Sequence, residues 1–250
     1  PNSTICNNTS TGIAVNGNII DAPMTFAWTR NNTVNVTGAN NGNSGNILPG
    51  NSFTIPTILN NTTTITQTVI FTITPSSNGC TGNQITITIN IAPSVTPGVI
   101  ASNQTICVGG DPNGFTQTTS ATGLNLTYQW QSSIISNTGP WSDILAATNA
   151  TYDASGPINQ TTWYRRLVIS TVNTAICTVA NTSPIEVTVN TINPGIISGN
   201  QTICSGGDPT EFTSVNATGS GTITYQWQSN ITGCGGSWTD ILNENNAVLD

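Results

Sequence analysis

The 250-residue chain contains no lysine, no histidine and only three arginines. Catalysis by proton transfer or by an activated nucleophile usually draws on histidine or on a close pair of carboxylates, so Ser-His-Asp and Cys-His sites are excluded. The ten acidic residues are scattered singly. With a net charge of −7, the chain also lacks the clustered cations that nucleic acids and anionic membranes attract. We therefore expect neither an enzyme nor a nucleic-acid-binding protein, and we expect no cofactor.

Long hydrophobic runs are missing as well. No apolar stretch approaches about 20 residues, so we expect no membrane-spanning helix. Threonine and asparagine take the place of charged residues and together make up about a third of the chain. Threonine favours strands and presents a neutral, hydrated surface, and the scarcity of lysine and arginine leaves trypsin-like proteases almost nothing to cut. These properties predict an extracellular, secreted protein.

The sequence repeats itself at the scale of a whole domain. The segment Asn103–Cys107 returns as Asn200–Cys204, and a fainter copy stands at Asn2–Cys6. Two tryptophans return at the same offset of 97 residues, as the pairs Trp130/Trp227 and Trp141/Trp238. A period near a hundred residues is the size of an independently folding domain. We predict domains at 1–92 and 97–190 and an incomplete copy of the second type at 194–250, and we expect the chain to be a segment of a longer protein.

The strand signals are those of an all-β protein. Ile85, Ile87, Ile89 and Ile91 alternate with polar residues, which predicts a strand with one buried and one exposed face. Asn-Gly pairs punctuate the strands, and a Cys…Trp…Cys layout recurs. The pattern predicts tandem immunoglobulin-like Greek-key β-sandwiches. Short proline-containing junctions at 92–98 and 191–195 predict that the domains are held end to end in an extended rod.

Six cysteines in such a chain indicate an oxidising compartment. None has the CxxC spacing of a zinc or redox site, and there is no histidine to complete a metal shell, so we predict no metal site. One cysteine opens a unit and another follows about 70 residues later, just before the last strand. We predict two disulfides, Cys6–Cys80 and Cys107–Cys177, each stabilising its own domain by about 4 kcal/mol.

The two remaining cysteines are not assigned by this pattern. Cys204 is the counterpart of Cys107, and its expected partner lies beyond Asp250. Cys234 has no counterpart in the second unit, where Asn137 stands. Cys234 pairs either with Cys204 or with a second downstream cysteine, and the sequence leaves both alternatives open.

A few residues are candidates for ligand contact. Trp141 and Trp238 lie beside glycine-containing loops and could stack on a sugar ring, although packing is the favoured interpretation because an Ile-Leu pair follows each. Asp111 and Asp208, in the repeated Gly-Gly-Asp-Pro, could ligate calcium. Calcium sites normally gather several acidic oxygens, and aspartate before proline commonly forms turns, so a structural turn is the favoured interpretation.

The motifs resemble a known family. Trp28, Asn35–Ala39 and Asn78–Asn83 make the first unit similar to the PKD-like domains of Bacteroidetes surface proteins. The second and third units resemble a sister type, marked by Thr127–Gln131 and Trp163–Arg166. The resemblance implies a very long cell-surface protein exported by the type IX secretion system, a class that includes the SprB-type gliding adhesins. Its expected partners are neighbouring repeats, a surface polysaccharide, and the secretion and surface-anchoring machinery of the cell.

Three classes of function are compatible with these observations. The favoured one is the stalk of an adhesin, which provides length and displays a binding end for cell adhesion and gliding motility. The second is a carbohydrate-binding accessory region of a secreted polysaccharide-degrading enzyme. The third is a subunit of a self-assembling surface filament.

Overall fold

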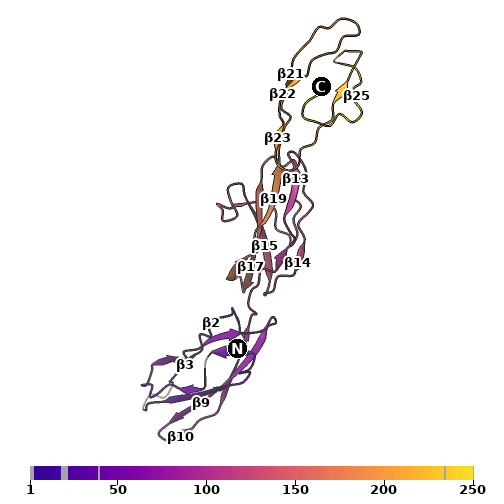
Figure 1. Ribbon diagram of the computed structural model, residues 1–250. Helices are drawn as coiled ribbons and strands as arrows, with labels where there is room; N and C mark the ends of the chain where they lie inside the picture. The colour runs from indigo at the N-terminus through magenta and orange to yellow at the C-terminus, as the bar shows by residue number, and fades with distance from the viewer. Residues whose placement is uncertain (1–2, 18–21, 39, 234, 250) are drawn as a thin grey trace. The chain divides into compact units, whose positions relative to one another are not determined.

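The structure is a computed structural model that describes residues 3–17, 22–38, 40–233 and 235–249. These residues form strands, turns and irregular segments (Figure 1). Within them, no helix has the length and apolarity needed to cross a membrane. The predicted all-β architecture of tandem sandwiches is confirmed. We call the part with β1 to β11 the first module, the part with β12 to β19 the second, and the part with β20 to β25 the third.

The first module is built around one large sheet. Its strand order is β1 (Ser3–Ile5), β11 (Ile85–Ile91), β9 (Gln67–Ser77), β4 (Thr25–Arg30) and β6 (Gly42–Asn43), with β10 (Cys80–Thr81) also paired to β9. Its smaller sheets join β2 (Thr9–Ser10), β8 (Ile58–Asn61) and β5 (Val36–Gly38), and β3 (Ala14–Asn16) with β7 (Ser52–Thr54). The pairing of β1 with β11 is parallel, whereas β9 pairs antiparallel with β4, β10 and β11, and the pairs of the smaller sheets are also antiparallel.

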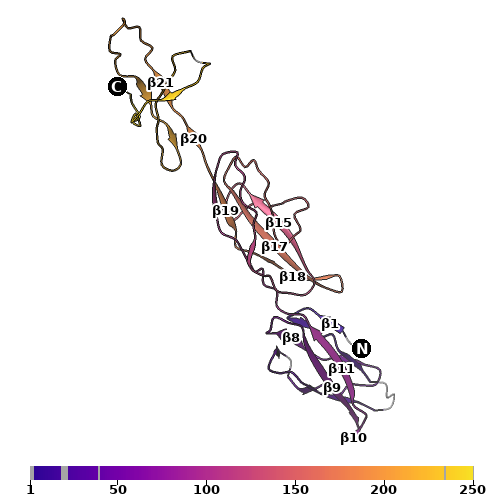
Figure 2. The ribbon, with the colours of Figure 1, turned by 90° about the vertical axis from the view of Figure 1, so that its right-hand side faces the viewer.

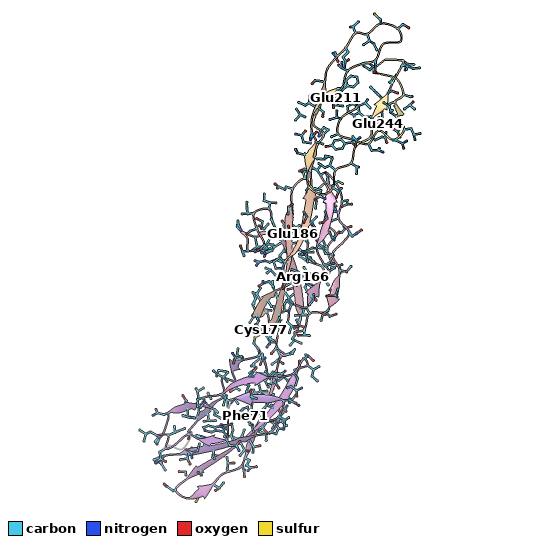
Figure 3. The ribbon with its side chains drawn as sticks, viewed as in Figure 1. Phe71, Arg166, Cys177, Glu186, Glu211 and Glu244 are labelled. Atoms are coloured by element: carbon cyan, nitrogen blue, oxygen red, sulfur yellow. A yellow bond between two sulfur atoms is a disulfide. The ribbon has the colours of Figure 1, made fainter. Side chains whose placement is uncertain are left out.

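Alternation along β9 creates the core of the first module. Val69, Phe71 and Ile73 are buried, and Phe71 lies among the strands of this module (Figure 3). Trp28, on β4, packs in the same cluster and donates its indole N–H to the carbonyl of Asn40 at 3.1 Å. A Cβ at Gly42 would lie 2.6 Å from the Trp28 ring, so β6 can pair beside that tryptophan only with glycine at this position.

The second module repeats this topology. Its large sheet has the order β13 (Gln104–Cys107), β19 (Ile185–Asn190), β17 (Thr162–Val172), β15 (Leu126–Ser133) and β16 (Ser142–Asp143), with β18 (Ala175–Asn181) also paired to β17. Figure 2 shows β15, β17, β18 and β19 side by side. A separate pair joins β12 (Val99–Ile100) and β14 (Gln117–Thr119). The first strand is again parallel to the last, since β13 runs with β19.

An aromatic cluster and one arginine fill the second module. Phe115, Trp130, Tyr152 and Tyr164 lie with ring centroids 4.8 to 6.3 Å apart. Arg166, also labelled in Figure 3, is fully buried, and burial lowers the pKa of its guanidinium. The guanidinium donates to Gln117 Oε1 at 3.1 Å, to the carbonyl of Pro97 at 2.8 Å and to the carbonyl of Ala150. Neutral acceptors therefore bind the two terminal nitrogens, and the Tyr128 ring centroid lies 4.8 Å from the guanidinium, whereas Nε has no hydrogen-bond partner among the described residues.

The third module has only short strand pairs. They are β20 (Ile192–Asn193) with β23 (Thr218–Gly219), β21 (Ile196–Ser198) with β22 (Thr213–Val215), and β24 (Gln228–Ser229) with β25 (Thr239–Asp240). Among the described residues after Thr191, none is fully buried, and large apolar side chains such as Ile196 remain exposed. This part of the chain has the turns of a sandwich without its packed core.

Candidate functional site

The structure contains a disulfide between Cys6 of the first module and Cys177 of the second, with a Cα–Cα distance of 5.3 Å. The predicted pairings Cys6–Cys80 and Cys107–Cys177 are therefore wrong. Of the four cysteines predicted to form disulfides, Cys6 and Cys177 do so, but they bond to each other and join two modules. Cys80 and Cys107 are exposed free thiols, as is Cys204. Cys234 lies outside the described residues.

The direction of the first strand explains why Cys6 does not bond to Cys80. Cys6 directly follows Ile5, which lies opposite Ile91 at the end of β11. In the adjacent strand β9, Gln67 is opposite Ile91, whereas Cys80 is opposite Ser77 at the other end of β9. β9 has 11 residues, and at a rise of roughly 3.3 Å per residue the distance from its first to its last Cα separates the two cysteines by about 33 Å. A disulfide needs Cα atoms within about 7 Å of each other.

The second module excludes the Cys107–Cys177 bond in the same way. Cys107 lies opposite Asn190, the last residue of β19. The neighbouring Val189 donates its N–H to Oγ1 of Thr161, the residue just before β17, at 3.1 Å. Cys177 belongs to the hairpin at the other end of β17. It lies between Ile176, which is opposite Thr171, and Thr178, which is opposite Ser170. Both modules therefore place the first-strand cysteine and the hairpin cysteine at opposite ends of a strand of 11 residues.

Trp141 is held on the surface of the second module. The Arg165 guanidinium lies 4.4 Å from the centroid of the Trp141 ring, which covers one face of the indole with a cation. Arg165 Nε donates to Gln131 Oε1 at 2.7 Å, and Gln131 Nε2 donates to Asp143 Oδ1 at 2.7 Å. A Cβ at Gly139 would lie 2.7 Å from the Trp141 ring, so the loop fits closely around it. Sugar binding by Trp141 stays a prediction, because nothing in these contacts tests it.

Trp238, its counterpart in the third module, is 53% exposed. It lines an open apolar groove of about 780 Å³ together with Phe212 and Trp227. In the second module the counterparts of Phe212 and Trp227, which are Phe115 and Trp130, are fully buried and lie with ring centroids 5.8 Å apart. Ligand contact at Trp238 likewise stays a prediction.

Asp111 has a structural partner. Its Oδ1 accepts the backbone N–H of Gly156 at 2.8 Å, which ties the Gly-Gly-Asp-Pro turn to the loop before β17. In the part of the chain that the structure describes, no three acidic or cysteine side chains gather in a way that could hold a metal ion. The geometry of Asp111 is that of a residue connecting two loops.

The repeats belong to recognisable families. Residues 96–191 and 193–250 each match the family DUF8696, described as a domain of unknown function. The chain belongs to that family. Residues 3–95 match the PKD-like domain, which confirms the resemblance of the first module. No curated protein sequence matches the chain.

Several solved structures of tandem domains show distant similarity. The three N-terminal domains of the bacteriophage RB49 highly immunogenic outer capsid protein share 9% identity at a TM-score of 0.43, over 75% of this chain and 67% of that one. Murine CEACAM1b shares 14% identity at a TM-score of 0.31, over 75% of this chain and 96% of that one. Immunoglobulin domains 1–5 of Sidekick-1 share 11% identity at a TM-score of 0.32, over 91% of this chain and 46% of that one. Similarity at these scores does not extend to function.

The link between Cys6 and Cys177 is the feature that sequence reasoning missed. Spacing showed which cysteines are equivalent, but it did not show at which end of a sheet each one lies. The feature that decides the end is the parallel pairing of the first and last strands. This pairing carries the opening cysteine to the far end of its module.

Proposed function

We propose that this chain is a structural segment of an extracellular protein, a spacer that holds a binding end away from a cell. The observation that carries this proposal is the Cys6–Cys177 disulfide, which joins a PKD-like module to a DUF8696 module. A bond within one domain stabilises that domain alone. A bond between two domains of one chain also limits how far the pair can lengthen when either one unfolds, which is useful in a part that must preserve length.

Neutral side-chain pairs support the same role. Thr68 Oγ1 donates to Asn90 Oδ1 at 2.8 Å, and the hydroxyls of Thr25 and Ser76 lie 2.6 Å apart across two strands. Salt screens interactions between exposed charges, but it has little effect on neutral hydrogen bonds of this kind. A surface of threonine and asparagine therefore suits a protein exposed to changing ionic strength outside the cell.

The more specific proposal is the stalk of a cell-surface adhesin of the SprB type, exported by the type IX system and built from modules 1–92, 97–190 and 194–250 in an extended rod. The PKD-like match and the domain-scale repetition support it. A surface polysaccharide would be bound at the far end, and the secretion and anchoring machinery would hold the near end. The modules described above would supply length and would not catalyse a reaction.

Deletion of one complete repeat tests this function. We expect that removing residues 97–193 from the full polypeptide shortens its projection from the cell by about 30 to 40 Å, the length of one sandwich. Electron microscopy of labelled cells would measure the projection, and an adhesion assay would report binding. We expect adhesion to persist after the deletion.

A matched variant separates length from ligand binding. Trp141→Ala removes the candidate sugar contact but leaves the number of modules unchanged, so both projection and adhesion should be retained. Loss of adhesion in Trp141→Ala cells with an unchanged projection would contradict the spacer role and would make the second module a receptor.

A further inference from the structure

We propose that Cys6–Cys177 is one link of a staggered series of disulfides. In this series, the cysteine that follows the first strand of each module bonds to the hairpin cysteine of the next module. Cys107 and Cys204 would then bond to hairpin cysteines of following modules, and Cys80 would bond to a first-strand cysteine of a preceding one. The inference goes beyond the spacer function, because it concerns the connection between modules and needs no ligand at either end.

Cys6 and Cys107 lie at the end of the first strand of their modules, and Cys204 begins the same turn as Cys107. The Ile5 carbonyl, one residue before Cys6, accepts the N–H of Ala92 at 3.0 Å beside the end of the last strand. Cys107 lies beside Asn190 at the end of the equivalent strand. Its carbonyl accepts the N–H of Gly110 at 2.9 Å, and the Cys204 carbonyl accepts that of Gly207 at 2.8 Å. The turn after Cys107 is thus reproduced after Cys204.

The hairpin cysteines form a second class. Cys80 and Cys177 each follow the longest strand of their sheet, β9 and β17, both of 11 residues. The turns before them use residues with positive φ, Asn78 at 48° in the first module and Asn173 at 48° in the second. The Cys6–Cys177 disulfide joins a member of the first class to a member of the second, taken from consecutive modules.

Geometry excludes a bond between the two classes inside one module. Within one module, a strand of 11 residues keeps them apart by about 33 Å. The free thiols of Cys80, Cys107 and Cys204 are exposed, so each is accessible to a neighbouring module. A periodic sequence that forms this bond once offers the same two positions at every later junction.

The chemistry of each link is a thiol oxidation. Two cysteine thiols lose two protons and two electrons and form one S–S bond. A disulfide oxidant of the class of oxidised glutathione accepts the electrons and is reduced to two thiols, by way of a mixed disulfide with one cysteine. An extracellular or similarly oxidising compartment supplies such an acceptor.

The series would fix the length of the array. Tension that enters at Cys6 would pass through the disulfide to Cys177, so the intervening residues would bear none of it. The first link that begins beyond Cys177 starts at Cys204, and the segment from Cys177 to Cys204 would carry the tension between these two links. Unfolding of a module would then add little to the length.

A chain with one duplicated repeat tests the series. A second copy of residues 97–193 is inserted after Asn193 in the 250-residue chain, and the protein is oxidised with a glutathione redox buffer. Pepsin is suitable for digestion, because the chain has no lysine and three arginines, and because acid suppresses disulfide exchange. We expect mass spectrometry to recover Cys6 bonded to the first Cys177, and the first Cys107 bonded to the second Cys177. Recovery of Cys107 bonded to Cys177 of its own copy, or left free, would overturn the proposal.

Single substitutions distinguish a fixed series from opportunistic pairing. With Cys6→Ser in the duplicated chain, the first Cys177 should become a free thiol while the bond from Cys107 to the second copy persists. If the first Cys107 instead bonded to the first Cys177, the pairing would not be set by position and the proposal would be wrong.

The unmodified 250-residue chain gives a test that depends on no variant. After denaturation without reduction, we expect an alkylating reagent to label Cys80, Cys107 and Cys204 but not Cys6 or Cys177. A bond from Cys80 to Cys107 or from Cys107 to Cys204 would overturn the series. These thiol measurements are independent of projection and adhesion, so the disulfide series and the spacer function can fail separately.

Discussion

In the second module, the indole N–H of Trp130 donates to the carbonyl of Asn149 at 2.9 Å, and in the third the indole of Trp227 donates to Asn246 at 3.0 Å. The neighbouring glutamines also correspond. Gln129 Nε2 donates to the Ile144 carbonyl at 2.8 Å, and Gln226 Nε2 donates to the Ile241 carbonyl at 2.8 Å. The two modules therefore carry the same hydrogen-bonded frame around their tryptophans.

The packing over that frame differs. Trp130 is fully buried, with Phe115 and Tyr152 at ring-centroid distances of 5.8 and 5.6 Å. Trp227 is only partly buried and faces the open groove described above. The frame joins residues 15 to 19 positions apart, whereas the core of the second module also needs the distant strand β17. The short-range hydrogen bonds are thus present in both modules, whereas the buried aromatic packing is present in the second, and burial of large apolar side chains stabilises more than a single hydrogen bond does.

The largest difference is expected from removing the two tryptophans. Trp130→Ala creates a cavity in a packed core and should lower the free energy of unfolding of the second module by about 3–5 kcal/mol. Trp227→Ala should lower that of the third module by less than half as much, because part of this side chain already contacts water. Hydrogen exchange measured by mass spectrometry would report the modules separately. Equal losses would mean that the third module is packed like the second.

A smaller difference is expected from the polar groups that reach equivalent carbonyls. Arg166→Met leaves the half-buried acceptors at Pro97 and Ala150 without their donor, which should cost about 1–3 kcal/mol. In the third module, Ser214 Oγ donates to the Ala247 carbonyl at 3.1 Å, and Ser214→Ala should cost less because water can replace it. Urea unfolding of both variants would measure this. An Arg166→Met protein as stable as the original would contradict the assigned role of the guanidinium.

The frame itself should respond equally in both modules. Gln129→Ala removes a side chain that donates to two carbonyls, and Gln226→Ala removes one that donates to three. We expect each variant to lose about 1 kcal/mol of local stability, measured from exchange of the Ile144 or Ile241 amide. If only the variant in the second module showed a loss, the frame would depend on the packed core.

The smallest expected effect concerns alkaline pH. Burial, reinforced by nearby Tyr152, raises the pKa of Tyr164 from its ordinary value of 10.0 to about 12. In the unfolded state, the Tyr164 phenol ionises at a lower pH than it does in the folded state. The stabilisation from this pKa difference is therefore complete below pH 10 and is lost as the pH rises to about 12. Tyr164→Phe should flatten the decline in unfolding midpoint over this range, with tyrosinate absorbance as the direct readout. An unchanged slope would show that Tyr164 ionises alike in both states.

The strands and core of the complete modules were largely predictable from the sequence. Alternation identified β9 and β11, and Ile89 and Ile91 are buried as it requires. Ile85 is nevertheless 52% exposed, because the start of β11 lies near the open end of the sheet. Alternation specifies a face of a strand, but it does not specify how far along that strand the core extends.

The disulfide was not predictable from spacing. The position of Cys6 depends on Ser3 pairing with Ile89, a contact between residues far apart in the sequence. Periodicity gives the strands but not their partners or directions. The packed interpretation of Trp141 was closer, because Arg165 covers one face of its ring, and that contact also depends on the register of β15 against β17.

Pulling a single 250-residue molecule from its two ends tests the covalent link between modules most directly. The Cys6–Cys177 bond closes one loop with a sequence separation of 171 residues. At roughly 3.5 Å per residue, we expect a reducing agent to release about 600 Å of contour length in one step under force. Cys177→Ser should abolish that step. Two shorter steps, each from a loop within one module, or no step at all, would contradict the account.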